Sequence, residues 1–239
     1  MWRGTGAPSI GCFWWSGSVR YWRVTKRLLS VANVRHAVNV TTGALAGQAA
    51  SSTVERLLDA AAGAFADRGF HATTTRDIAS RAGLSPAGVY VHFDSKEAVL
   101  YALSRRGHEA ALDLVRGSAT GPGTPTERVA RVMSGFATWH AEHYEVARVV
   151  QYEFPHLQPE HRDEVLTLRK DIDEAVRELL EEGVASGEFA VTDVRETALA
   201  LMSLCIDVAR WYSPGVRRTP DRIGPTYASL GLRLLGARG

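Results

Sequence analysis

Four of the eight histidines in this 239-residue chain lie between Phe136 and Val165. His140 and His143 are three positions apart on a predicted helix, and with Glu153 they are side chains of the types that bind zinc. Zinc-binding helices more often place two histidines four positions apart beside a glutamate, and that motif is absent from this sequence. One hypothesis is therefore a metal-binding protein or small helical enzyme that uses these three residues. Two other hypotheses are that the histidines form polar edges of the core, or that the segment forms one wall of a ligand pocket.

Other catalytic patterns are missing. The sequence has no nucleophile elbow, no glycine-rich phosphate loop and no paired catalytic carboxylates. We therefore expect no enzymatic activity, no cofactor and no bound metal. The two cysteines, Cys12 and Cys205, are far apart and exclude a disulfide framework, so we expect a reducing, cytoplasmic location. No apolar run reaches the roughly 18 residues of a membrane-spanning helix, so we expect no membrane association.

The charge is unevenly distributed. The chain has a net charge of +2, and its first acidic residue is Glu55. Six basic residues precede it, so residues 55–239 are net negative. A chain of this kind binds DNA only through a local arrangement of side chains, because its body has no general attraction for phosphate.

Residues 1–50 differ from the rest. They contain four of the six tryptophans and no acidic residue. Three hypotheses fit this segment: a basic arm that contacts DNA phosphates, a targeting segment, or a mis-assigned translation start. We favour a disordered extension or a mis-assigned start, with the folded protein beginning near Ser51. Removal of residues 1–50 is then expected to leave folding and DNA binding nearly intact.

From Ser51 onward apolar residues recur at three- and four-residue steps, and no alternating strand pattern is present. The predicted fold is all-α. Cap signals place helix starts at Ser52 with Glu55, Thr74 with Asp77, Asp94 with Glu97, and Thr124 with Glu127. Later helices are predicted at about 127–141, 143–153, 159–183, 193–212 and 220–236. We expect two folded domains, at 51–100 and 101–239.

The stretch from Thr73 to Leu100 has the spacing of a helix-turn-helix. Gly83 suits the positive φ of the tight turn, and Ser85 followed by Pro86 starts a second helix of only two turns, to about His92. Such a short helix is marginal alone, so its neighbours must hold it. Pro86, Ala87 and Gly88 are small enough to allow close approach to a DNA groove.

Residues 54–103 resemble the DNA-binding domain of the TetR family of transcriptional regulators. The resemblance is carried by Phe65-Ala-Asp-Arg-Gly-Phe70, the threonine run, Asp77-Ile-Ala, Gly83-Leu-Ser, Gly88-Val-Tyr, His92-Phe and Ser95-Lys-Glu. It implies that Thr75, Tyr90, His92 and Lys96 contact phosphates. It implies that Arg76, Ser85, Pro86, Ala87 and Gly88 form the groove face. Val91 departs from the family, which more often has tyrosine there.

The resemblance also implies a homodimer that binds double-stranded operator DNA, most often as a repressor released by a small molecule. Two apolar stripes, at 195–213 and 222–235, are predicted to face the partner subunit or to pack internally. Short matches at 147–154 and 209–215 are similar to a branch that responds to acyl-CoA. The expected ligand-binding residues are Phe136, Trp139, His143, Arg148, Tyr152, Arg169, Met202, Arg210 and Trp211. Alternatively, Arg210 pairs with Asp207, and Trp211 is an ordinary core residue.

Overall fold

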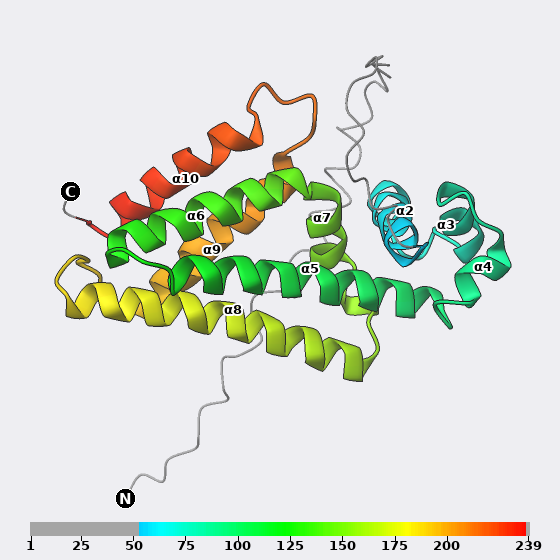
Figure 1. Cartoon of the computed structure of the whole chain (residues 1–239), viewed down its shortest axis with the longest axis horizontal. Coiled ribbons are helices and arrows are strands. Elements are labelled where there is room, and N and C mark those ends of the chain that lie inside the picture. The colour runs from blue at the N-terminus through cyan, green and yellow to red at the C-terminus, as the bar shows by residue number, and fades with distance from the viewer. Residues whose placement is uncertain (1–52, 238–239) are drawn as a thin grey trace, which may run out of the picture. The chain divides into compact units, whose positions relative to one another are not determined.

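The computed structural model describes residues 53–237, and within them the chain is helical with no strand (Figure 1). The described elements are α2 (Thr53–Arg68), α3 (Thr75–Arg81), α4 (Pro86–Tyr90), α5 (Lys96–Ala119), α6 (Pro125–Glu142), α7 (Tyr144–Tyr152), the 3₁₀ helix η1 (Phe154–His156), α8 (Pro159–Ala185), α9 (Val194–Trp211) and α10 (Pro220–Leu234). The predicted all-α class is confirmed. The predictions for residues 1–50 and for the Ser52 cap concern residues outside this described range.

Side-chain caps fix where several helices begin. Thr74 and Asp77 form a reciprocal capping box at the start of α3, and Thr124 and Glu127 form another at α6. Both were predicted. The predicted start at Asp94 is wrong by one residue, because the Ser95 side chain accepts the hydrogen bond from the Ala98 backbone N–H, at 3.0 Å.

Helices α2, α3 and α4 pack together beside the N-terminal part of α5 (Figure 1). Their shared core is built from fully buried side chains: Leu57, Ala61, Phe65, Ile78, Ala79, Val89, Val99, Leu100 and Leu103. Helix α5 runs without a break from this core into the C-terminal helices, and it crosses the predicted domain boundary at residue 100. A rigid helix therefore joins the two groups of elements.

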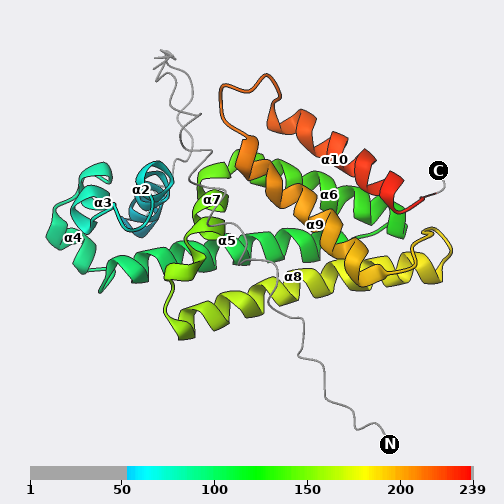
Figure 2. The ribbon, with the colours of Figure 1, turned by 180° about the vertical axis from the view of Figure 1, so that it is seen from behind.

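The C-terminal helices form two layers. Helix α8 lies along α5, and α10 lies along α6, with α9 packed against both α6 and α8 (Figure 2). One continuous apolar core fills the space between them and includes Phe136, Met202 and Cys205. None of the helices among residues 53–237 is long and apolar enough to cross a membrane.

The two predicted apolar stripes are divided by this packing. Met202, Cys205, Ala209 and Ile223 are buried inside the single chain, so for these residues the internal-packing alternative holds. Leu204, Leu230 and Leu234 remain between 38% and 56% exposed on α9 and α10. Helices α9 and α10 therefore bury one side against α6, and these three leucines stay on the side that α6 does not cover.

Candidate nucleic-acid interface

The turn between α3 and α4 is set by three residues. Gly83 has φ of 69°, in the left-handed region where a Cβ is strained. The Ser85 side chain accepts a hydrogen bond from the Gly88 backbone N–H at 3.2 Å, and Pro86 occupies the first helical position. Helix α4 ends at Tyr90, two residues earlier than predicted, because the amide groups of His92 and Phe93 both bond to Val89 in a tightened turn.

A short helix needs a fixed support, and the side chain of Val89 provides it. Val89, Ile78 and Ala79 are each 0% exposed and form the contact between α3, α4 and α2. The buried side of α4 is therefore fixed by packing, and its other side is left to solvent.

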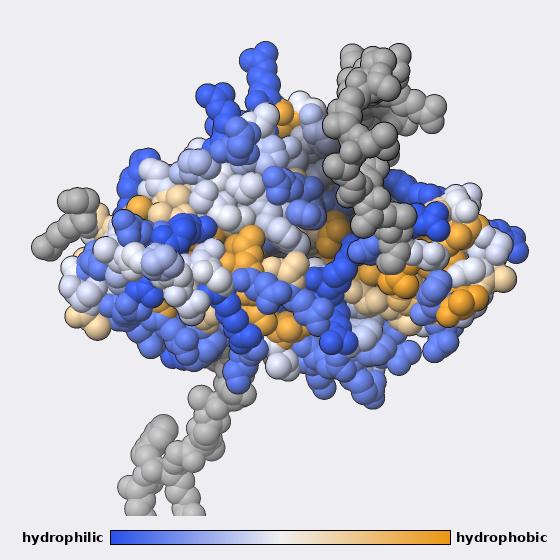
Figure 3. Space-filling view, viewed as in Figure 1, coloured by the Kyte–Doolittle hydropathy of each residue, from blue (hydrophilic) through white to orange (hydrophobic). Residues whose placement is uncertain are grey.

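The outer side collects most of the residues predicted to contact DNA. Arg76, Ser85, Pro86, Ala87, Tyr90 and His92 are exposed, whereas Thr75, Gly88 and Lys96 are partly buried. The Thr75 and Tyr90 hydroxyls lie 3.1 Å apart and link α3 to α4. In Figure 3 this end of the molecule shows hydrophilic residues interspersed with apolar patches. Tyr90 and Val91 are 54% and 77% exposed.

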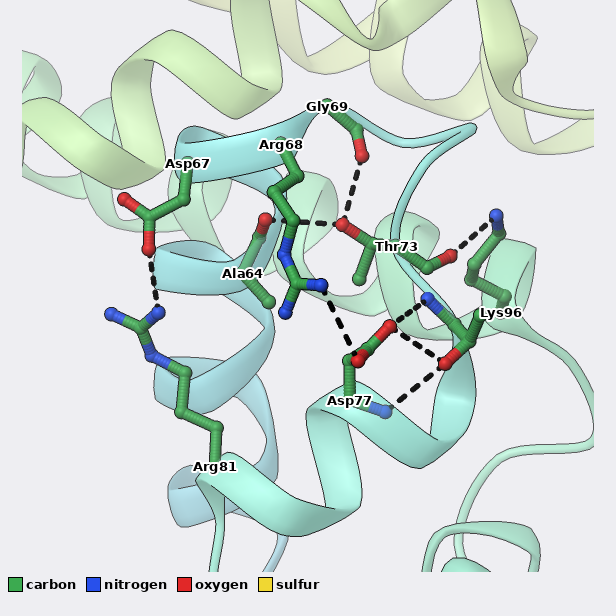
Figure 4. Close-up of polar contacts among 9 residues, drawn as sticks. Ala64, Asp67, Arg68, Gly69, Thr73, Asp77, Arg81 and Lys96 are labelled. Carbon is green, nitrogen blue, oxygen red and sulfur yellow. Dashed lines mark hydrogen bonds and ion pairs between the residues drawn. The ribbon is translucent and has the colours of Figure 1, made fainter. Parts of the chain in front are cut away.

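Lys96 and Thr73 hold the turn that precedes α3 (Figure 4). The Thr73 hydroxyl donates to the carbonyls of Ala64 and Gly69, at 3.0 and 2.8 Å. The Lys96 ammonium donates to the carbonyls of Phe70 and Thr73, at 2.6 and 2.8 Å. Burial lowers the pKa of Lys96, while Glu153 opposes that shift. Lys96 therefore has a structural role that the sequence did not indicate.

Two arginines of this region are held by ion pairs. Arg81 lies 2.7 Å from Asp67, and Arg68 lies 3.4 Å from Asp77 (Figure 4). Hydrogen bonds from Thr74 lower the pKa of Asp77, with a smaller contribution from Arg68. Arg76 is exposed and makes no ion pair within residues 53–237, so its guanidinium is the charge on α3 that remains open to an anion.

The chain resembles known proteins in both parts. Residues 57–103 match the model for bacterial regulatory proteins of the tetR family, and residues 122–235 match the tetracyclin repressor-like C-terminal domain. The HTH-type transcriptional repressor KstR2 of Rhodococcus jostii is 35% identical over 184 residues, covering 73% of this chain and 86% of the relative. The chain belongs to the TetR family. It is a DNA-binding transcriptional regulator, and α3 and α4 form its helix-turn-helix.

Solved structures share this TetR-family fold. The ketosteroid transcriptional regulator KstR2 of Mycobacterium tuberculosis is 28% identical, with a TM-score of 0.71 over 79% of this chain and 96% of that chain. AibR, solved with isovaleryl coenzyme A and operator DNA, is 20% identical, with a TM-score of 0.69 over 78% of this chain and 100% of that chain. The second likeness shows the fold alone.

The predicted ligand-binding residues of this TetR-family chain fall into separate groups. Phe136 and Met202 are each 3% exposed within the C-terminal core. Trp139 is partly buried, and its indole stacks on the exposed His143 ring with centroids 4.9 Å apart. These four side chains could surround the apolar part of a ligand, but they supply no fixed charge for its polar part.

Arg148 on α7 donates hydrogen bonds to backbone carbonyls at the C-terminal end of α9. Its guanidinium donates to the backbone carbonyls of Ala209 at 2.6 Å and Tyr212 at 2.6 Å, and more weakly to that of Arg210 at 3.4 Å. Its guanidinium also lies 5.0 Å from the centre of the Tyr144 ring. Burial lowers the pKa of Arg148. Arg148 thus satisfies the carbonyls that the end of α9 leaves without helical partners.

Arg210 and its neighbours lie at the same junction of α7 and α9. Arg210 is exposed and makes two hydrogen bonds to Asp207, at 2.5 and 2.8 Å, which is the pairing considered as its alternative role. Trp211 is partly buried, and its ring lies 6.2 Å from that of Tyr212. Burial raises the pKa of Tyr152, whose hydroxyl also feels the charges of Arg210 and Asp207.

Arg169 on α8 points into the interior instead. Its Nε donates to Nε2 of His108 at 2.9 Å, and its guanidinium lies 4.0 Å from the centre of the Phe154 ring. Burial lowers the pKa of Arg169 to about 9. Burial, and then the charge of Arg169, lowers the pKa of His108 to about 3. His108 is therefore a neutral acceptor at physiological pH.

The alternative metal site is wrong for the described residues. Among residues 53–237 no three His, Cys, Asp or Glu side chains are grouped so that they could hold a metal ion. The Nδ1 atoms of His140 and His143 instead face backbone carbonyls one turn back, at 2.8 and 3.1 Å. Glu153 pairs with His156 at 3.5 Å. The three residues belong to different local contacts.

The sequence did not predict His108 as a buried partner, and it did not predict the contacts that Phe70, Glu97 and His161 make. His108 and Arg169 meet across 61 positions, and Glu97 and His161 across 64. No periodicity joins residues so far apart. The available signal was chemical: a histidine within an otherwise apolar helical face requires a polar partner when it is buried.

Proposed function

We propose that this regulator is a homodimeric repressor that places the N-terminal end of α4 in the major groove of operator DNA. The observation that carries the proposal is Gly88. A Cβ there would meet Leu84 and Ser85 only at ordinary contact distances of 3.6 and 3.7 Å, so packing within the chain does not require glycine. Glycine inside a helix is unfavourable by roughly 0.5–1 kcal/mol. A close approach of DNA explains why this position has no side chain.

The other predicted contacts divide by chemistry. Arg76, Ser85, Pro86 and Ala87 are exposed on α3 and at the start of α4 and would face base edges, where direct contacts distinguish bases. Thr75, Tyr90 and His92 have polar tips suited to phosphate oxygens. These assignments of individual residues rest on exposure and on the resemblance to the family.

Lys96 remains a proposed phosphate contact with an added constraint. An ammonium has three N–H donors, and the carbonyls of Phe70 and Thr73 accept two of them. The third donor is left for a phosphate, and the ammonium is held in place before DNA arrives.

Gel shifts with the DNA upstream of the gene test the operator proposal. Lys96→Ala is expected to weaken binding to all sequences and to reduce the salt slope by about one, whereas Gly88→Val is expected to abolish selective binding. Val54→Ala, on the exposed side of α2, is the control. A Lys96→Ala protein with altered sequence preference and an unchanged salt slope would contradict the assigned roles.

The homodimer is supported by the exposed leucines of α9 and α10. Leu204, Leu230 and Leu234 are apolar and open to solvent, and two-fold pairing of these helices would cover them in a four-helix interface. Two copies also match the two half-sites that helix-turn-helix proteins commonly bind. Replacement of Leu230 and Leu234 by glutamate is expected to give a monomer in analytical ultracentrifugation.

A CoA ester from lipid or steroid breakdown is the proposed effector. The relative KstR2 is named as a ketosteroid regulator, and the fold is seen with isovaleryl coenzyme A in AibR. Arg148, Arg169 and Arg210 offer guanidinium groups, which suit phosphate, although each already has partners in this structure. Phe136, Trp139 and Met202 offer apolar surroundings, and Tyr152, His143 and Trp211 offer aromatic rings with polar tips.

A titration panel tests the effector. Medium-chain, long-chain and ring-derived acyl-CoA esters are expected to release the protein from its operator, while the matching free acids do so poorly. Release by free acids or cationic drugs, with CoA esters inactive, would contradict the proposal. A regulator of this kind would act on chromosomal DNA in the cytoplasm and would catalyse no reaction.

A further inference from the structure

Residues 153–161, which we name the strap, connect the end of α7 through η1 to the first turn of α8. The strap lies against the DNA-binding domain at two places far apart in sequence. One contact involves the turn between α2 and α3, and the other involves the first turn of α5. The fully buried side chains of the helix-turn-helix, Ile78, Ala79 and Val89, come from α3 and α4 and not from the strap.

The first contact is aromatic. The Phe70 ring stacks on the His156 ring, with centroids 5.2 Å apart and an interplanar angle of 12°, and the Lys96 ammonium lies 4.3 Å from the Phe70 centroid. His71 meets the same His156 ring edge-on at 4.2 Å. The turn that precedes α3 is therefore held between α5 and the strap, and Lys96 also bonds its carbonyls.

The second contact is polar and partly buried. One oxygen of Glu97, whose side chain is 13% exposed, accepts hydrogen bonds from the backbone N–H of Gln158 at 3.0 Å and from Nδ1 of His161 at 2.9 Å. The His161 ring stacks on Tyr101, with centroids 3.7 Å apart. A carboxylate that accepts two donors in a partly buried setting forms a directional joint, because both donors must keep their positions.

The other side of the strap meets the C-terminal interior. Phe154, at the start of η1, is 8% exposed and lies under the Arg169 guanidinium. Arg169 also donates to the carbonyl of Val150 at 3.3 Å and to His108. Phe154 and His156 both belong to η1, so this short helix contacts Arg169 through one residue and Phe70 through the other.

We propose that the strap is a positioning element that fixes the orientation of the helix-turn-helix relative to the C-terminal helices, through Phe70 with His156 and Glu97 with Gln158 and His161. The operator part of this inference rests on the proposed function. Glu97 and Phe70 then determine which half-site spacing a dimer accepts, without touching DNA. Loss of either contact widens the range of orientations and leaves the groove-reading surface intact.

The test uses the full-length protein and a panel of operators whose half-sites are separated by the native spacing or by one to three base pairs more or fewer. The wild type is expected to prefer one spacing by about tenfold or more, because rigid linkage raises the effective concentration of the second site only at matching geometry. Glu97→Ala and Phe70→Leu are expected to reduce that preference below about threefold. Affinity of the Glu97→Ala protein for an isolated half-site is expected to stay unchanged.

Matched variants separate positioning from loss of structure. Glu109→Ala is the control, because Glu109 lies on the same helix and pairs with Arg105 in an exposed contact at 2.8 Å. Glu97→Gln keeps an oxygen acceptor and is expected to restore the preference. If the wild type shows no selective DNA binding, the proposed function fails. If it shows a preference that Glu97→Ala and Phe70→Leu retain, the strap inference alone fails.

A measurement without DNA covers variants that bind poorly. Ser80 and Lys170 are exposed on α3 and α8, and a spin label on cysteine at each reports the distance between the two domains in a Cys12→Ser background. Excess unlabelled chain limits each dimer to one labelled subunit. Broader distance distributions in Glu97→Ala and Phe70→Leu than in Glu109→Ala support the proposal, and equal widths overturn it.

Discussion

The two ends of this TetR-family regulator use contacts of different range. In the helix-turn-helix, Thr74 with Asp77 and Ser85 with Gly88 join residues three positions apart at the surface. In the C-terminal helices, Arg148 with Ala209 and Arg169 with His108 join residues 61 positions apart, with much of each side chain buried. The helix starts of the DNA-binding end are therefore specified by local chemistry, and the C-terminal interior by packing between distant segments.

The difference has a functional consequence. A surface that reads DNA must keep its shape before the partner arrives, and local caps with a small apolar core give that shape at low cost. An interior that responds to a ligand needs polar groups whose partners come from separate helices, because movement of one helix then changes the others. His108 and Arg169 meet this requirement, while Thr74 and Asp77 do not.

The largest expected effect is a loss of stability in acid that comes from the C-terminal interior. Burial lowers the pKa of His108 to about 3 and that of His140 to about 4, from 6.5, so the unfolded chain binds these protons more tightly. The stability is full above about pH 6.5 and falls as the pH drops below it. The loss between pH 7 and pH 5 is on the order of 2 kcal/mol per histidine.

Urea unfolding at pH 7, 6 and 5 measures this loss. His143→Gln, which changes an exposed residue, is expected to keep the full pH dependence. A midpoint that stays constant from pH 7 to pH 5 would contradict the comparison, because the interior would then contain no buried neutral histidine.

A smaller effect is expected from Gly224→Ala, where α10 crosses α6. A Cβ at this position would lie 2.7 Å from the backbone carbonyl oxygen of Ser134, which cannot rotate away. The free energy of unfolding is expected to fall by about 1–3 kcal/mol. Gly117→Ala is the control, since a Cβ there meets nothing within 4 Å, and it is expected to be neutral or stabilising. Equal thermal shifts for the two variants would argue against tight packing of these helices.

Gly83→Ala tests the stability of the DNA-binding end, and here the expected loss comes from backbone conformation and not from packing. A Cβ at Gly83 has open space around it, so the penalty comes from the positive φ alone and is about 1–2 kcal/mol. Gly83→Asn is expected to cost less, because asparagine tolerates this conformation better. Chemical denaturation ranks the three proteins, and an asparagine variant less stable than the alanine variant would refute a purely local cause.

The smallest expected effect is that of Thr74→Ala, which removes the capping box of α3. The loss is about 1 kcal/mol, and Thr74→Ser is expected to retain most of the stability because its hydroxyl can accept the same bond from Asp77. Hydrogen exchange of the α3 amides localises the change. Faster exchange throughout the C-terminal helices would show that the two ends are less independent than their contacts indicate.

The helices were largely predictable, and the reason is local. Apolar periodicity, the Thr74 and Thr124 caps, and Pro125 at the first helical position placed most helix bounds within two residues. The Asp94 start failed by one position, because two neighbouring residues, Asp94 and Ser95, can both cap and sequence alone does not choose between them.

The sequence by itself determined the helix-turn-helix: Gly83, Ser85 and Pro86 act through their own backbone and near neighbours. Only the tertiary structure decided the partners of the charged interior groups. Arg148 satisfies the end of α9, Arg169 meets His108, and Glu97 joins the strap. Long-range contacts depend on how helices cross, and helix crossing depends on the packing of the whole core, which no short stretch of sequence contains.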